Sequence, residues 1–306
     1  EIDSLNFTPN MINMLLYQNG ATDDLTVAGI DSIVFRPADD IEANAILIEY
    51  NNDIATVRHN ITSEYFNVNV NGADVEIISE ASIEGLQYYL SGTTTNGSFS
   101  LESDMPYEVI LNNTEITSLT NVPLNLSKNV ERNIIIANGT TNILSDSEDS
   151  DGKAVINSKG ATNISGFGSL TINANKKHGI SSDNDINIDG ATISINHSAD
   201  ASKGLKSDCN IMITDGDVNI VSSGTLTLEA LDLGYDATYC TSIGADGNFE
   251  MRGGKLNITL PVSNEAGRGI KTDGDISISG GEINIVSHSG GDTYTNSDGE
   301  IDSYKS

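Results

Sequence analysis

Short stretches in which apolar and polar residues alternate recur along the second half of the chain. One of them, GISSDNDINIDGATISI, runs from Gly179 to Ile195, and GLKSDCNIMITDGDVNI follows from Gly204 to Ile220. A third copy, GIKTDGDISISGGEINI, spans Gly269 to Ile285. Because alternation with a period of two is typical of a strand that buries one face, each copy predicts short β-strands separated by turns.

The copies keep a common register, which is clearest at one aspartate position. Asp183, Asp208, Asp246 and Asp273 are separated by 25, 38 and 27 residues, and the long step contains an insertion from Ser222 to Tyr239. Strands this short do not fold as independent hairpins, but stacked copies bury a continuous column of Ile and Leu. The repeat therefore predicts an all-β protein with a right-handed parallel β-helix. A β-sandwich of short strands is the alternative, and it does not explain the register.

Residues 1–70 do not carry the repeat. Segments 11–17 and 25–35 are predicted as strands, and Ala45–Tyr50 with Ile54–Val57 as a hairpin around an Asn-Asn-Asp turn. Because the open end of a solenoid presents unpaired strand edges, we interpret residues 1–70 as a small β domain or N-terminal β cap. Residues 71–306 then form the β-helix.

The net charge of the chain limits the classes of partner that it can bind. Its 306 residues include 15 Lys and Arg against 44 Asp and Glu, which gives a formal net charge of −29. This charge disfavours nucleic acid and anionic membranes and favours divalent cations. No run approaches the roughly 18 apolar residues that a membrane span needs. Cys209 and Cys240 lack metal-type spacing, and burial as small apolar side chains is favoured over a disulfide.

The repeated aspartate creates an electrostatic problem. Equivalent residues of neighbouring coils lie about 4.8 Å apart, so each adjacent carboxylate pair would repel by roughly 3.5 kcal/mol at an effective dielectric of 20. Three remedies are open: splaying into water, pairing with Lys206 and Lys271, or a bound cation. Calcium suits the last because it takes six to eight oxygen ligands. The predicted calcium ligands are Asp183, Asp185, Asp208, Asp246 and Asp273.

Two features weigh against that assignment. Lys159 stands where the aspartate column would extend upstream. Aspartate is also a common turn residue that bonds its own backbone, so the column has a purely structural interpretation.

A longer pattern adds a family resemblance. The line from Gly179, with His178 before it and GSLTINAN upstream, resembles a calcium- and carbohydrate-binding β-helix family first described from a cellulose-degrading clostridium. YYLSGTTTNGSFSLESDMPYEVILNNTEIT followed by NIIIANGTTNILSDS is similar to the start of that family. The resemblance covers Asp74 to the end of the chain. It implies a pectate-lyase-like solenoid that binds a cellulose- or pectin-like polysaccharide with calcium and without cleavage.

The resemblance also carries expectations about location. IDSIVF, residues 30–35, resembles segments of secreted proteins from gut Bacteroidetes. We expect a secreted or outer-surface protein, a monomer, whose export signal or lipid anchor belonged to a removed N-terminal segment.

Three functions follow from these observations. The first is non-catalytic, calcium-dependent polysaccharide binding, with Tyr235 and Tyr239 beside the insertion as the aromatic residues best placed for sugar contact. The second is a pectate-type lyase, in which calcium neutralises a uronate and Lys206 takes the proton. The third is a structural or adhesive surface protein without a glycan ligand. His178, Lys203 and Arg268 share one repeat position and are interpreted as surface residues, so no catalytic residue is assigned.

Overall fold

The computed structural model describes residues 2–7, 13–18, 21–26, 41–80, 82–262 and 266–304, and the side chains from residue 41 onward. The chain forms two compact units, residues 1–42 and 43–306. In the first, β1 (Ile2–Phe7), β2 (Asn13–Gln18) and β3 (Ala21–Thr26) form an antiparallel sheet. The predicted strand at 11–17 corresponds to β2, whereas residues 27–35 of the other predicted strand lie outside the described residues.

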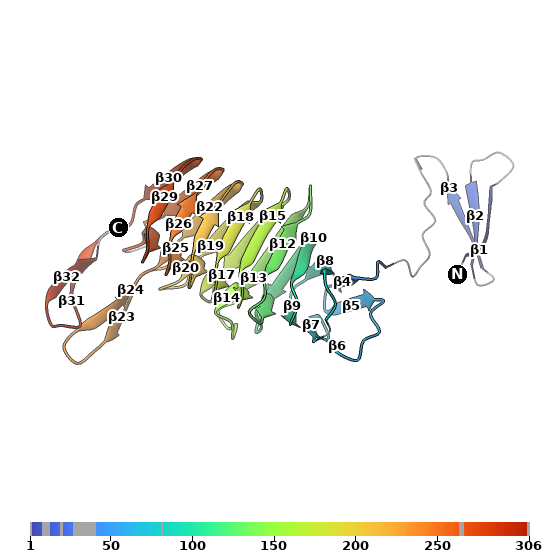
Figure 1. Cartoon of the computed structure of the whole chain (residues 1–306), viewed down its shortest axis with the longest axis horizontal. Coiled ribbons are helices and arrows are strands. Elements are labelled where there is room, and N and C mark those ends of the chain that lie inside the picture. Colours follow the sequence, from blue (N-terminus) through green and yellow to red (C-terminus); the bar gives the residue numbers. More distant parts are fainter. Residues whose placement is uncertain are drawn as a thin grey trace. The chain divides into compact units, whose positions relative to one another are not determined.

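The second unit is a parallel β-helix of about eight coils, as Figure 1 shows. The residues that the structure describes contain strands and no helix, so the predicted fold class is confirmed. No helix is therefore long and apolar enough to cross a membrane within the described part of the chain. Each coil visits three faces, and each strand pairs in parallel with its equivalent one coil away, as Ile180 does with Leu205.

The first two faces are halves of one continuous sheet. It is continuous because two long strands, β8 (Leu86–Thr94) and β10 (Tyr107–Ser118), run across both halves. The first face continues with β12 (Arg132–Ile136), β15 (Thr162–Gly166), β18 (Ile186–Asp189), β21 (Ile211–Ile213), β26 (Phe249–Met251) and β29 (Ile276–Ile278). The second continues with β13 (Thr141–Asp146), β16 (Ser169–Ala174), β19 (Thr192–His197), β22 (Asp217–Ser222), β27 (Lys255–Leu260) and β30 (Glu282–Ser287).

The third face is a separate nine-stranded sheet, and it matters most for function. Its strands are β6 (Phe66–Asn71), β7 (Asp74–Ser79), β9 (Ser98–Ser103), β11 (Leu124–Ser127), β14 (Ala154–Ser158), β17 (His178–Ser182), β20 (Lys203–Ser207), β25 (Thr241–Ala245) and β28 (Arg268–Thr272). Two hairpins leave the coils near the carboxyl-terminal end: β23 (Thr227–Ala230) with β24 (Tyr235–Thr238), and β31 (Asp292–Thr295) with β32 (Ile301–Tyr304).

Antiparallel hairpins end the parallel sheets at the amino-terminal side. The predicted hairpin is confirmed as β4 (Ala45–Asn51) and β5 (Ile54–His59), and β4 also pairs in parallel with β8. In the same way, β6 pairs antiparallel with β7, which pairs in parallel with β9. These hairpins therefore share sheets with the coils and give the stack antiparallel outer strands.

The core consists of the predicted apolar columns. Ile180, Leu205 and Ile243 stack on the third face and are fully buried. Ile276 and Ile278 of the last coil are instead more than half exposed, since no described strand pairs with the outer edge of β29.

Arg132 is a buried charge without a carboxylate partner in the described part of the chain. Its guanidinium donates to the carbonyls of Leu126, Lys128 and Val130 and to Ser158 Oγ, with both Nη1 bonds at 2.7 Å. Burial lowers the pKa of Arg132, but an arginine keeps its charge in proteins. Arg132 thus fixes the turn after β11 against β14.

Removing this guanidinium should destabilise the solenoid. We expect Arg132→Met to cost about 3 kcal/mol, because several buried acceptors lose their donors. Urea denaturation followed by circular dichroism measures the loss. Arg252→Met is the matched control: Arg252 makes an exposed ion pair with Glu250, and its loss should leave the stability nearly unchanged. Equal losses in the two variants would contradict a special role for Arg132.

Candidate functional site

The outer surface of the third face carries a groove made of two adjoining clefts. Both are lined by Val122, Asp151 and Gly152, which therefore mark their junction. The amide cleft has a volume of about 460 Å³, and its other lining residues are Asn69, Asn71, Asp74, Val75, Glu76, Ser98, Ser100, Asn121 and Asn125. The lysine cleft has a volume of about 470 Å³, and its other lining residues are Lys153, Asn157, Lys159, Lys177, His178, Ser181, Asp183, Lys206 and Asp208. Together they form the third-face groove.

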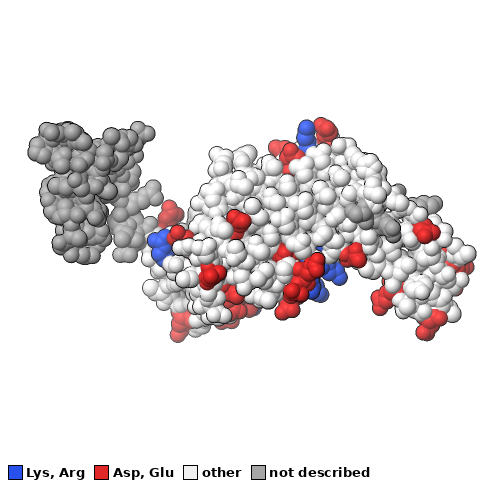
Figure 2. Space-filling model, turned by 180° about the vertical axis from the view of Figure 1, so that it is seen from behind, with Lys and Arg blue, Asp and Glu red and all other residues white. Residues whose placement is uncertain are grey.

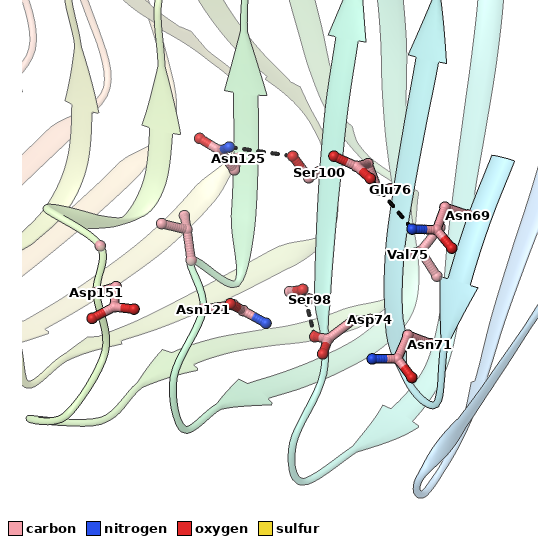
Figure 3. Close-up of a pocket in the computed structure, with 12 residues that line it drawn as sticks. Asn69, Asn71, Asp74, Val75, Glu76, Ser98, Ser100, Asn121, Asn125 and Asp151 are labelled. Atoms are coloured by element: carbon pink, nitrogen blue, oxygen red, sulfur yellow. Dashed lines mark hydrogen bonds between the residues drawn. The ribbon is translucent and has the colours of Figure 1, made fainter. Parts of the chain in front are cut away.

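The amide cleft is lined mainly by uncharged hydrogen-bonding groups and by three carboxylates, those of Asp74, Glu76 and Asp151 (Figure 3). Ser98 Oγ donates to Asp74 Oδ1 at 2.6 Å, which orients that carboxylate. An amide ladder leads from this cleft into the next: Asn157 Nδ2 donates to Asn125 Oδ1 at 2.9 Å, and Asn125 Nδ2 donates to Ser100 Oγ at 3.2 Å. Such a row presents alternating donors and acceptors at the coil spacing of about 4.8 Å.

His178 lies on the wall of the lysine cleft and is only 6% exposed. Its Nδ1 accepts the backbone N–H of Lys203 at 2.9 Å, so the neutral ring carries its proton on Nε2. Burial, and then the charges of Lys177, Lys203 and Lys206, lower the pKa of His178 to about 3. The imidazole is therefore neutral at any ordinary pH.

The four repeated aspartates form one column along the corner after the third face. The backbone N–H groups of Asp183 and Asp208 donate to the carbonyls of Ser158 and Ser182, each at 3.0 Å, and Asp246 and Asp273 repeat the pattern. Lys159 occupies the upstream position of the column, as its register predicts.

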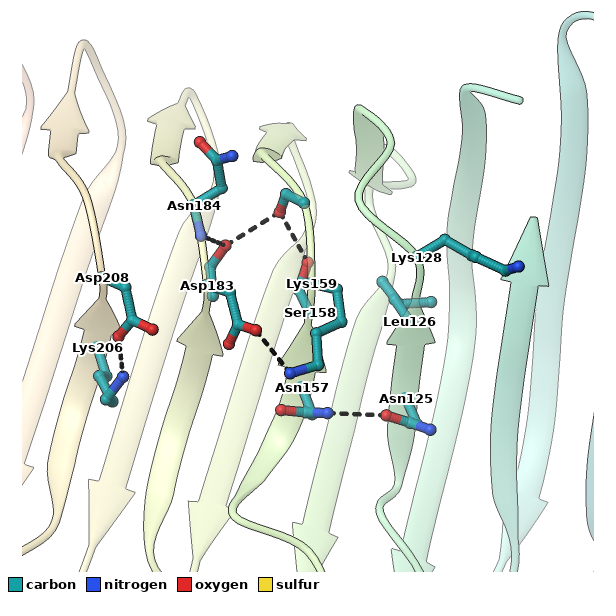
Figure 4. A network of polar contacts seen from close by, with 12 residues as sticks. Asn125, Leu126, Lys128, Asn157, Ser158, Lys159, Asp183, Asn184, Lys206 and Asp208 are labelled. Atoms are coloured by element: carbon teal, nitrogen blue, oxygen red, sulfur yellow. Dashed lines mark hydrogen bonds and ion pairs between the residues drawn. The ribbon is translucent and has the colours of Figure 1, made fainter. Parts of the chain in front are cut away.

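Lysines relieve the predicted repulsion in this column (Figure 4). Lys159 Nζ lies 2.6 Å from Asp183 Oδ2, and the side chains of Lys206 and Lys271 form ion pairs with Asp208 and Asp273. Figure 2 shows the same pairing of opposite charges over one face of the surface, where the few Lys and Arg side chains (blue) lie beside Asp and Glu side chains (red). The sequence left three ways to relieve the repulsion between these carboxylates, and the structure shows one of them, pairing with lysine.

Asp246 differs from the other three aspartates. The residue that pairs in register with Lys206 and Lys271 is Gly244, which has no side chain to offer. Lys203 covers this glycine, since a Cβ there would come within 2.7 Å of Lys203 Cδ. Asp246 therefore has no ion pair among the residues described.

Asp185 bonds to the equivalent corner of the next coil. Its Oδ1 accepts both the backbone N–H and the Nδ2 of Asn210 at 2.9 Å, and Asn210 Oδ1 accepts the backbone N–H of Asn248 in the next coil. Within the described residues, no three His, Cys, Asp or Glu side chains converge as a metal site would require. The five calcium ligands stay predictions, and the column offers the ion one unpaired carboxylate.

The two predicted sugar-binding tyrosines lie outside the groove. Tyr235 is 43% exposed on β24, and the Arg268 guanidinium carbon lies 3.3 Å from the centre of the Tyr239 ring. Neither tyrosine lines either cleft, so their role in sugar contact stays a prediction. No disulfide joins the two cysteines, and Cys240 is buried while Cys209 is half-buried.

Sequence reasoning missed the basic residues that converge on the lysine cleft. His178 was interpreted as a surface residue and is buried, at the start of β17, where it pairs in register with Ala154 and bonds to Lys203 of the next coil. Lys153 and Lys177 were not singled out, although they are 24 residues apart and stand at one repeat position. The repeat period, applied to lysine as it was to aspartate, was the signal that could have found them.

The pairing in the column can be tested at Asp273. Its pKa is lowered by a hydrogen bond from Lys271 and then by the Lys271 charge, so Lys271→Met should raise that pKa. A lowered carboxyl pKa stabilises the fold above the unfolded value near 3.8 and stops doing so as the pH falls through the folded value. The variant should therefore be less stable than the wild type above about pH 4, and the two should converge in acid. Carboxyl-carbon NMR titration measures the shift, with Lys255→Met as a control that leaves Asp273 unchanged.

Comparison with known proteins gives three matches. The sequence pattern of the family described as "Carbohydrate-binding domain-containing protein" matches residues 71–306. A carbohydrate-binding domain-containing protein of Acetivibrio thermocellus is 29% identical over 141 residues, 42% of this chain, and the chain spans about half (49%) of that relative. A solved structure of a polysaccharide lyase-like protein from C. thermocellum, a gadolinium derivative, covers 79% of this chain and 97% of its own with a TM-score of 0.53. At 19% identity, this last likeness shows the fold.

Proposed function

The chain belongs to the carbohydrate-binding domain family, and on this premise we propose that it binds a polysaccharide along its third-face groove. The observation that carries the proposal is that the residues matched by the family, 71–306, build the whole of the lysine cleft and nearly all of the amide cleft. The cleft walls consist mainly of amides, hydroxyls and charged groups, which suit the hydroxyls of sugars.

The groove favours an extended glycan that lies across the strands. It crosses successive third-face strands from β6 to β20, so its hydrogen-bonding groups repeat along the solenoid axis. The amide ladder Ser100–Asn125–Asn157 follows this direction. A chain of similar sugars can therefore meet similar groups on successive coils. We expect a cellulose- or pectin-like polymer and a protein that works at the cell surface or after secretion.

The proposal includes one calcium-binding position in the aspartate column. Asp246 is the column carboxylate without an ion pair among the residues described, and it would hold the ion together with water and oxygens of the glycan, because calcium needs six to eight oxygen ligands. When bound, the ion would supply positive charge to an acidic sugar beside an acidic edge.

A non-catalytic role is the better supported of two chemical alternatives. The ammonium of Lys206, the predicted lyase base, is engaged by the carboxylate of Asp208. One observation favours a lyase instead: burial lowers the pKa of Lys203, and a base needs the neutral amine. Release of unsaturated uronide from polygalacturonate would establish that activity.

Affinity electrophoresis through gels that contain polygalacturonate or a soluble cellulose derivative tests the proposal. We expect retardation of the wild type and, with calcium present, a stronger effect on polygalacturonate. Asp246→Asn should reduce the calcium-dependent part of the affinity about tenfold, the scale of one contact to a charged group.

Asp232→Asn is the control, because it removes the same charge from the exposed insertion. Equal retardation in calcium and in chelator would remove calcium from the proposal. A wild-type protein that no glycan retards would overturn polysaccharide binding and leave the structural or adhesive alternative.

A further inference from the structure

The lysine cleft concentrates positive charge on a strongly acidic protein. The chain has 15 Lys and Arg in all, and four lysines line this one cleft, with a fifth, Lys203, bonded to its wall through His178. They come from three consecutive coils, those that contain β14, β17 and β20. A local positive site on a chain of net charge −29 attracts an anion only at close range, where the nearby ammonium groups outweigh the distant carboxylates.

Two of the lysines are uncommitted. Lys159 and Lys206 are paired with Asp183 and Asp208, as described above. Lys153 and Lys177 are exposed and make no ion pair or side-chain hydrogen bond with any residue described. Because the backbone N–H of His178 donates to the Lys153 carbonyl, the two uncommitted lysines occupy equivalent positions one coil apart. Their ammonium groups are thus available to the same ligand.

His178 adds a fixed neutral donor between them. More than nine-tenths of its surface is buried, it lines the cleft, and its Nδ1 is already occupied by the N–H of Lys203. No described residue accepts a hydrogen bond from its Nε2–H, which a ligand can therefore receive. The hydroxyl of Ser181, on the same wall, is a further donor. A buried imidazole held as a donor beside two free ammonium groups suits the oxygens of an anion.

We propose that the lysine cleft is an oxyanion site, in which Lys153, Lys177 and His178 bind a carboxylate or sulfate group of an anionic glycan directly, without a metal ion. This inference rests on the proposed function, since the amide cleft would hold the hydroxyls of the same chain. Dense polyanions are disfavoured because the chain carries a net charge of −29, which repels charge that extends beyond the cleft. The ligand is therefore a glycan whose anionic groups are spaced by sugar rings.

The experiment measures glycan affinity in chelator, so that calcium cannot contribute. Titration calorimetry compares polygalacturonate, a sulfated polysaccharide and a neutral cellulose derivative. The variant is Lys153→Ala with Lys177→Ala, and the control is Lys176→Ala with Lys255→Ala, which removes two exposed lysines from outside the cleft. All four side chains are exposed, and equal melting temperatures would verify that both proteins are folded.

We expect the wild type to bind at least one anionic glycan in chelator, and added salt to weaken that binding. The cleft variant should lose at least tenfold in affinity, and the control less than twofold. His178→Phe, which keeps a ring in the wall but removes the donor, should lose several-fold. The anionic glycan that loses affinity identifies the group as carboxylate or sulfate, while binding of the neutral derivative should not change.

Two results separate this inference from the function on which it rests. If the wild type binds no glycan under any condition, the proposed function fails. If it binds only a neutral glycan, or an anionic one only in calcium, or if the cleft variant binds anionic glycans as the control does, the oxyanion site is overturned while polysaccharide binding stands.

Discussion

Parallel hydrogen bonding between equivalent strands is the interaction on which the whole molecule depends. It holds each residue of a coil about 4.8 Å from its counterpart in the next, so any choice of side chain is repeated as a column. Inside, the rule is favourable, because Ile on Ile buries apolar surface continuously. On the outer surface, the same stacking would place like charges next to one another. The solenoid avoids that repulsion with amides that bond to one another or with lysine beside aspartate. The chemistry of each face is set by columns more than by single residues.

The columns explain which parts of the structure could be predicted from the sequence. The burial of Ile180, Leu205 and Ile243 could be predicted from the spacing of the repeat copies, because burial along a regular stack follows from register alone. The hairpin at β4 and β5 was found from alternation and an Asn-rich turn. The aspartate column was also correct as geometry, and so was the interruption at Lys159. These features depend on one dimension of the fold, the direction along the stack.

The arrangement of side chains around each coil, perpendicular to the stack, could not be predicted in the same way. The cleft walls combine strands with turns around residues 119–122 and 147–152, where the coils differ in length and the repeat period does not predict where a residue lies. Asp146 is an example: it begins an acidic run, residues 146–152, yet it ends β13 and is only 3% exposed. Burial raises its pKa, although the backbone N–H groups of Asn175 and Lys176 bond to it. Whether a residue beyond the last strand position points inward depends on how the corner turns.

The insertion between β22 and β25 shows how such a protein can change during evolution. The step from Asp208 to Asp246 is 38 residues, 11 to 13 more than the steps of 27 and 25 residues on either side of it, and the extra residues leave the stack as a hairpin. The strands on either side still pair in register, Lys203 with Thr241 and Ile220 with Ile258. Each coil contacts only its neighbours, so a coil can be duplicated, lost or lengthened without redesign of the others. A duplication within the groove would lengthen it by one coil, and selection could thus match the length of a bound polymer by counting repeats.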